Sequence, residues 1–158
     1  MDRSAAILAA TVVGVVGGAS IVGKIGGGWL SDRFSARWGL SARVNLLFAV
    51  VLLEGLTLML FSRMGALPLA IATLLVFSLF VQMACGATYG VVPFVNRRAM
   101  GTVAGIVGAG GNAGAVAAGF LFRSEGLAVQ QGFLYLGLAV TGISIAALLL
   151  YGRDKGMR

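Results

Sequence analysis

The chain is dominated by long apolar runs that are separated by short polar segments. Five runs are continuous, at residues 5–30, 44–61, 67–94, 101–122 and 129–151. A helix rises about 1.5 Å per residue, so about 20 apolar residues cross a hydrocarbon core about 30 Å thick. The runs do not alternate between apolar and polar positions, as β-barrel strands would. The pattern therefore predicts an all-α polytopic membrane bundle of about five helices with short antiparallel connections.

Composition supports an integral membrane protein. Of the 158 residues, 59% are hydrophobic and only 11% are charged, and the mean hydropathy is +0.98. The net charge is +7, but the basic residues flank apolar runs and form no stripe with interleaved aromatics, so we expect no nucleic-acid partner. Residues 5–20 resemble a signal peptide, yet the run continues past them and Met1 to Arg3 carry almost no net charge, so we expect this span to remain in the protein.

Few residues offer catalytic or metal chemistry. The chain has no histidine and one cysteine, Cys85, which is read as a small packing residue. No Ser/His/Asp constellation, zinc set or phosphate-binding glycine loop occurs in the sequence. We therefore expect no enzyme, no cofactor and no metal.

The distribution of lysine and arginine predicts how the chain lies in the membrane. By the positive-inside rule, the amino terminus lies outside and the carboxyl terminus in the cytoplasm of a plasma (inner) membrane. One side of the predicted bundle carries eight basic residues: Arg33, Arg37, Arg43, Arg97, Arg98, Arg153, Lys155 and Arg158. The other side carries Arg3, Arg63 and Arg123.

Two charged residues, Lys24 and Glu54, lie within predicted spans. A charge at the bilayer centre costs at least about 2.5 to 3.5 kcal/mol, so each should face protein or a water-filled cavity. Counted from the cytoplasmic ends of their spans, they lie about 9 Å and 15 Å deep and can reach each other. A structural ion pair or a snorkelling lysine is one interpretation. The other is that Lys24 lines an anion path and that Glu54 sets its charge or carries a proton.

Glycine is abundant in two of the spans, which predicts close contact between helices in lipid. In the fourth span, Gly110 and Gly111 precede Asn112. This residue places an amide side chain in the middle of an apolar span, which packing does not explain. Its amide either donates hydrogen bonds to an anion or bridges to another helix. The glycines are Gly14, Gly17, Gly18, Gly23, Gly26, Gly27 and Gly28 in the first span, and Gly101, Gly105, Gly108, Gly110, Gly111, Gly114 and Gly119 in the fourth.

Two segments resemble known transporters. The segment from Gly28 to Arg37, GWLSDRFSAR with Asp32 and Arg33 at its centre, resembles the G-x-x-x-D-R-x-G-R-R loop of the major facilitator superfamily, with Ser35 and Ala36 in place of its Gly and first Arg. The segment 85–114, CGATYGVVPFVNRRAMGTVAGIVGAGGNAG, resembles the nitrate/nitrite porter family within that superfamily. The signature of that family is a G-x-G-G-N-x-G helix after a P-F-V-x-R-R loop.

The resemblance implies nitrate or nitrite transport by alternating access, in nitrate assimilation. Family members have twelve spans, so residues 1–158 would form a C-terminal half-domain, spans eight to twelve of a partial major facilitator fold that lacks its N-terminal half and seventh span. The family's anion-binding arginine aligns with Lys24, which offers a point charge in place of a planar fork. Gly110, Gly111 and Asn112 match the signature and would contact the substrate path.

Two alternatives remain open from the sequence. The first is a stand-alone five-span protein that acts as a structural or regulatory partner through its glycine faces. The second is a major facilitator transporter of another small anion. Met1 is followed closely by a span, as at a genuine start, which favours the stand-alone protein. The lack of a second half argues against it, since one half has no anion path of its own.

Overall fold

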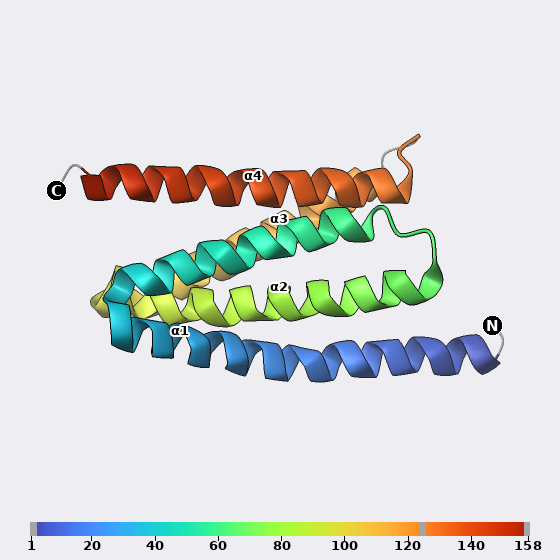
Figure 1. Ribbon diagram of the computed structural model, residues 1–158, viewed down its shortest axis with the longest axis horizontal. Coiled ribbons are helices and arrows are strands. Elements are labelled where there is room, and N and C mark those ends of the chain that lie inside the picture. The colour runs from blue at the N-terminus through green and yellow to red at the C-terminus, as the bar shows by residue number, and fades with distance from the viewer. Residues whose placement is uncertain (1–2, 124–125, 157–158) are drawn as a thin grey trace.

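The computed structural model describes residues 3–123 and 126–156 as an elongated bundle of helices (Figure 1). Helix α1 covers Arg3–Phe61, α2 Leu67–Val95, α3 Met100–Arg123 and α4 Val129–Gly156, and a short 3₁₀ helix, η1 at Arg97–Ala99, precedes α3. The described residues contain no strand. The four long helices are long and apolar enough to cross a membrane. The predicted all-α membrane bundle is thus confirmed.

Helix α1 is two helices joined at Gly39. This residue has φ 74° and ψ −170°, a conformation that is accessible almost only to glycine, and it turns the chain back on itself. We call residues 3–38 the first arm and residues 40–61 the second arm, so the bundle has five helical segments. The prediction of a loop at residues 31–43 was wrong apart from this kink. The end of an apolar run indicates where contact with lipid ends, but it does not indicate where the helix ends. Residues 31–38 contain no proline, and they continue the first helix up to Gly39.

The five segments alternate in direction (Figure 1). The Gly39 kink, the α2–α3 connection and the end of α4 lie at one end of the bundle, and the other connections lie at the opposite end with the N-terminus. Arg33, Arg37, Arg43, Arg97, Arg98 and Arg153 therefore belong to the first end, which we call the basic end, and Arg3, Arg63 and Arg123 to the other. Arg158 and the side chain of Lys155 lie outside the described part of the chain.

The first arm crosses α2 at glycines. A Cβ atom at Gly23 would lie 2.6 Å from Cβ of Gln82, and one at Gly27 would overlap the backbone of Met83. On α2, a Cβ atom at Gly86 would overlap the carbonyl of Lys24. The two backbones therefore touch directly, which confirms the expected close packing for this part of the first span.

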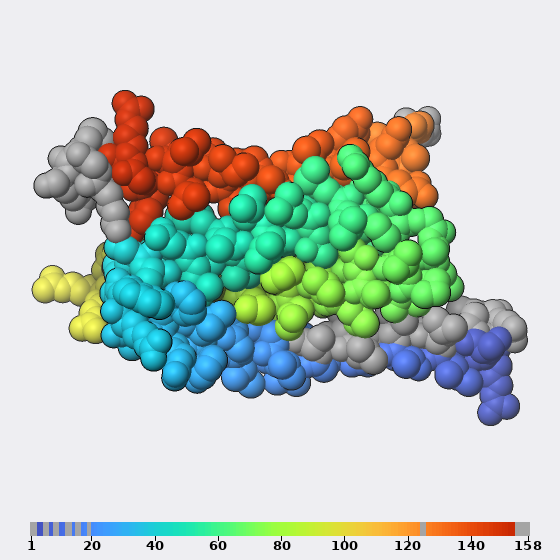
Figure 2. All heavy atoms as spheres, in the orientation of Figure 1, coloured from blue at the N-terminus to red at the C-terminus, as the bar shows by residue number. Residues whose placement is uncertain are grey.

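The second arm lies between α2 and α4 and makes a similar crossing with α4 (Figure 2). A Cβ atom at Gly137 would lie 2.6 Å from Cγ of Met59 and 2.9 Å from the carbonyl oxygen of Gly55. The Ser144 hydroxyl donates a hydrogen bond of 2.9 Å to the Phe48 carbonyl at the same interface. The buried apolar residues are Val50 and Leu58 of the second arm and Ala84, Ala87 and Val92 of α2. The buried apolar residues among those described thus belong to the second arm and α2, the two middle segments of the bundle.

Helix α3 is the least covered element. None of its residues is buried, and its seven glycines, Gly101 to Gly119, have open space where a Cβ atom would stand. At its end, the Phe122 ring lies 4.9 Å from that of Phe133 and fills the space above Gly132 of α4. The close contact expected of these glycines is therefore not made with the described residues of this chain.

The glycine crossing of the first arm is testable by two neighbouring substitutions. Gly27→Ala should destabilise the protein by about 1 to 3 kcal/mol, because the backbone of Met83 cannot rotate away from the added methyl group. Gly26→Ala is the matched control, since nothing lies within 4 Å of its Cβ position, and it should be neutral or slightly stabilising. Thermal unfolding of the purified variants measures both. Equal melting temperatures would contradict the crossing.

Candidate functional site

Lys24, Glu54 and Asn112 lie in one layer across the bundle. Lys24 and Glu54 are each fifteen residues from Gly39, on opposite arms of α1, which is about 22 Å of helix. Asn112 is twelve residues, or about 18 Å, from the start of α3 at Met100. A residue this far from the end of the bundle would lie near the centre of a bilayer with a headgroup region about 7 Å thick and a core about 30 Å thick. The predicted depth of 9 Å for Lys24 was counted from the end of the apolar run, whereas the helix continues to the kink at Gly39.

Lys24 and Glu54 do not pair. Lys24 is exposed on the first arm, and the single ion pair among the described side chains joins other residues. Glu54 is half-buried, and it shares a helical face with Val50 and Leu58, which are buried four residues before and after it. Equal distance from the kink does not bring the two side chains together, because both arms pack on α2. The expectation that they reach each other is not met in this structure.

Asn112 and its two preceding glycines lie on the uncovered helix α3. Gly110, Gly111 and Asn112 are all exposed, and a Cβ atom at either glycine would have no neighbour within 4 Å. The described residues offer no hydrogen-bond partner to the Asn112 amide, so the predicted bridge to a neighbouring helix is absent within this part of the chain. The amide donors and the bare backbone beside them face open space, where a small ligand can approach.

Asp32 of the loop motif joins a compact polar cluster at the basic end. The Arg43 guanidinium donates a hydrogen bond of 2.5 Å to the Asp32 carboxylate and another of 2.5 Å to the Gly90 carbonyl of α2. Its carbon Cζ lies 4.9 Å from the centre of the Phe94 ring. The Arg43 side chain is 8% exposed and that of Asp32 is 71% exposed. One buried arginine therefore ties both arms of α1 to α2.

Gly90 makes room for this cluster. A Cβ atom there would lie 3.1 Å from Nη1 of Arg43 and 3.3 Å from the Ser31 hydroxyl, which is fully buried. The Ser31 hydroxyl and the Arg43 Nε have no hydrogen-bond partner among the described residues. Sequence reasoning counted Arg43 only as a membrane flank. The sequence offered one indication of this role. Arg43 lies four residues after Gly39 and directly before the apolar run that begins at Val44.

The other residues of the loop motif do not join the cluster. The Arg33 guanidinium lies 5.5 Å from the centre of the Trp29 ring. Arg37 is exposed and has no ion-pair partner among the described residues. Gly28 has open space at its Cβ position.

The P-F-V-N-R-R segment turns the chain from α2 into α3. Pro93 has no N–H and lies two residues before the end of α2 at Val95. The Asn96 side chain then accepts a hydrogen bond of 3.0 Å from the Arg98 N–H and caps η1. Arg97 and Arg98 are thereby held exposed at the basic end, directly before the glycine helix α3.

Curated proteins similar to this chain are nitrate transporters of plants and cyanobacteria. High-affinity nitrate transporter 2.3 of Oryza sativa subsp. japonica is 35% identical over 126 residues, which are 78% of this chain and 24% of the rice protein. High affinity nitrate transporter 2.7 of Arabidopsis thaliana is 36% identical over 144 residues, 90% of this chain and 29% of that protein. The nitrate/nitrite transporter NrtP of a Picosynechococcus strain is 38% identical over 143 residues, 78% of this chain and 25% of NrtP.

The chain thus spans about a quarter of the length of the relatives that it matches. The relatives are transport proteins, in agreement with the expectation that the chain is no enzyme. No family model and no solved structure matches the chain.

The Arg43 cluster predicts strong coupling between two residues. Asp32→Asn should destabilise the protein, because it leaves the buried Arg43 charge without its counter-ion, and Arg43→Met should relieve part of that cost by removing the charge. A double-mutant cycle on the free energy of unfolding should give a coupling above about 1 kcal/mol, the upper limit for exposed pairs. Arg37→Met is the control and should change stability by less than about 0.5 kcal/mol. A coupling within the range of exposed pairs would reduce the cluster to a surface contact.

Proposed function

Because the chain belongs to the nitrate/nitrite porter family, we propose that it forms the C-terminal part of a transporter that moves nitrate or nitrite by alternating access. The observation that carries this proposal is the uncovered helix α3. An apolar helix of 24 residues with no buried residue lacks the neighbours that its glycines are suited to. The missing N-terminal half and seventh span of the transporter supply them, and nitrate assimilation is the physiological role.

We propose that the anion binds in the layer of Lys24 and Asn112. Lys24 supplies a positive charge near the bilayer centre, and Asn112 supplies amide donors beside the bare backbone of Gly110 and Gly111. Both side chains are exposed on the described surface, so both are open to the other half of the transporter. Lysine binds an oxyanion as a point charge, without the bidentate geometry of arginine. This difference favours a second candidate substrate, another small anion that needs no planar fork.

Glu54 is proposed to set the charge of this layer or to carry a coupling proton. It lies on the buried face of the second arm, level with Lys24 but not paired with it. A carboxyl group at this depth is costly unless it has a function or a partner.

The proposed surroundings are the lipid bilayer of a plasma (inner) membrane. The basic end lies in the cytoplasm, with the carboxyl terminus, and the amino terminus of this chain lies outside. The six described arginines at one end against three at the other support this orientation. The loop motif with Asp32, Arg33 and Arg37 is then cytoplasmic. No nucleic acid and no cofactor enter this function.

Substitution of the two binding residues tests the site. In the full reading frame that contains this chain, Lys24→Ala and Asn112→Ala should each lower nitrate uptake, with KM rising about tenfold or more for Lys24→Ala, because a hydrogen bond to a charged group contributes about 1.5 to 3 kcal/mol. Lys24→Arg should retain uptake. Thr102→Ala, an exposed polar position on the same helix α3, is the control. Wild-type KM for both alanine variants at equal membrane abundance would remove these residues from the site.

The coupling role of Glu54 is tested separately. Transport is measured with and without a proton gradient in the wild type and in Glu54→Gln. If the carboxyl group carries the proton, the wild type should respond to the gradient and the glutamine variant should lose that response. Glu54→Asp, which keeps the carboxyl group, should keep part of it. An unchanged gradient dependence in Glu54→Gln excludes Glu54 as the proton carrier.

A further inference from the structure

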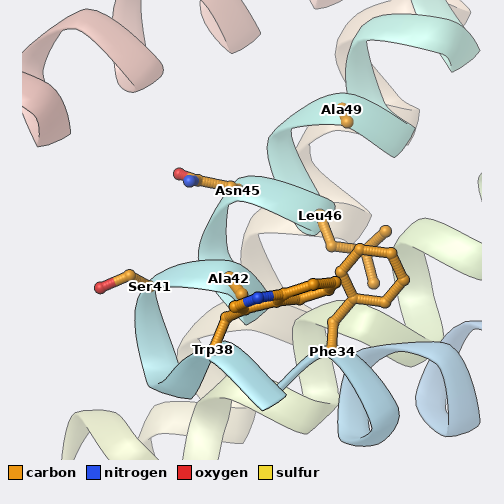
Figure 3. Close-up of a pocket in the computed structure, with 7 residues that line it drawn as sticks. All are labelled: Phe34, Trp38, Ser41, Ala42, Asn45, Leu46 and Ala49. Atoms are coloured by element: carbon orange, nitrogen blue, oxygen red, sulfur yellow. The ribbon is translucent and has the colours of Figure 1, made fainter.

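An apolar groove runs along the outer side of the second arm at the basic end. Its first part, a cavity of about 500 Å³, lies between the rings of Phe34 and Trp38 and one face of the second arm from Ser41 to Ala49 (Figure 3). Its second part, of about 310 Å³, lies between the second arm and α4 and is lined by Leu52 and Ile145. Asn45 and Ala49 line both parts, so the two cavities adjoin at these residues. We call them together the outer groove.

The outer groove has an apolar floor and a polar edge. The rings of Phe34 and Trp38 lie with their centres 5.2 Å apart and their planes tilted by 57°, and Trp38 remains 62% exposed. Ser41 and Asn45, one helical turn apart, point to the same side, away from the two rings (Figure 3). Asn45 is only six residues, about 9 Å of helix, from the kink at the basic end. This depth is close to the headgroup region of a bilayer.

Two exposed arginines lie in the last turns of the first arm, next in the sequence to the two rings of the groove. Arg37 directly precedes Trp38, is exposed and has no ion-pair partner among the described residues. Arg33 lies one turn earlier and is exposed as well. The acidic Asp32 beside it is engaged by Arg43. Arg33 and Arg37 thus belong to the same helical turns as Phe34 and Trp38, and no described carboxylate pairs with either of them.

We propose that the outer groove binds one anionic phospholipid of the leaflet at the basic end. One acyl chain lies along Trp38, Leu46 and Ala49, and the phosphate lies at Arg37, where Ser41 and Asn45 donate hydrogen bonds. Basic pockets between membrane helices on the cytoplasmic side bind such headgroups, and tryptophan prefers this depth. Lipid binding in the outer groove does not depend on which anion is transported.

The shape of the groove favours a lipid over a protein segment. Together the two cavities run from Phe34 and Trp38 at the basic end to Leu52 on the second arm and to residues 144–148 of α4, and they do not continue along the rest of the second arm to Phe61. A further transmembrane helix packed here would instead follow the second arm along its length. The positive charge of this part of the first arm also selects between lipids, since a zwitterionic headgroup gains little from it.

Trp38 provides a direct probe, because this chain has only two tryptophans. The full reading frame is expressed, purified and reconstituted in vesicles that contain phosphatidylglycerol and phosphatidylcholine, with one or the other brominated. The Trp38 signal is the difference in fluorescence between the protein and its Trp38→Phe variant. Brominated phosphatidylglycerol should quench Trp38 about two- to fivefold more effectively than brominated phosphatidylcholine at equal mole fraction, since a basic residue near an anionic lipid contributes about 1 kcal/mol.

Two variants locate the preference. Arg37→Gln, which removes the charge, and Ala49→Phe, which fills the groove, should each bring the quenching ratio toward one. Ala72→Phe, at an exposed alanine of α2 outside the groove, should leave the ratio unchanged.

Equal quenching by both lipids in the wild type would show that bulk lipid covers the groove, and the proposal would fail. Absence of quenching by either lipid would show that another segment of the protein occupies it, with the same consequence. The wild-type measurement decides the proposal even if a variant does not fold.

Discussion

The bundle depends on direct contact between helix backbones. In lipid, an apolar side chain gains nothing by leaving hydrocarbon for another helix, so association rests on van der Waals contact and on polar bonds. This chain uses both. Gly27 and Gly86 let the first arm touch α2, Gly55 and Gly137 let the second arm touch α4, and the core between them is small. Where such a crossing is absent, as along α3, the helix stands almost alone.

The single arginine Arg43 supplies the polar bond that the glycine contacts lack. Its fork reaches the carboxylate of Asp32 and a carbonyl of α2 at once, and lysine has no such geometry. The contrast with Lys24 is instructive. At the buried cluster the chain uses a guanidinium, whereas in the central layer it uses a mobile point charge. The second arm thus carries the cation that holds the helices together, and the first arm carries the cation that we propose to bind the anion.

The sequence predicted the all-helical membrane class, because long apolar runs are typical of contact with lipid. The predicted spans 67–94 and 101–122 differ from α2 and α3 by one residue at their ends, whereas α4 continues five residues beyond the predicted span, from Tyr151 to Gly156. The sequence did not predict that residues 31–38 continue the first helix, since hydropathy does not mark where a helix ends. It also predicted that the side chains of Lys24 and Glu54 can reach each other, and they do not pair in the structure. Depth along a helix follows from counting residues, but rotation and spacing depend on which helices pack together. Arg43 was missed as a structural residue for the same reason.

The kink at Gly39 limits how the chain can change in length. Connections between helices usually tolerate insertions and deletions, because they lie at the surface and hold few fixed contacts. Here the turn is one residue long, and helix resumes at once on both sides. Each residue added or removed between Gly39 and Arg43 turns the guanidinium by about 100° around the second arm. Both of its bonds would then be lost, so this short segment has a fixed length although it lies at the end of the bundle.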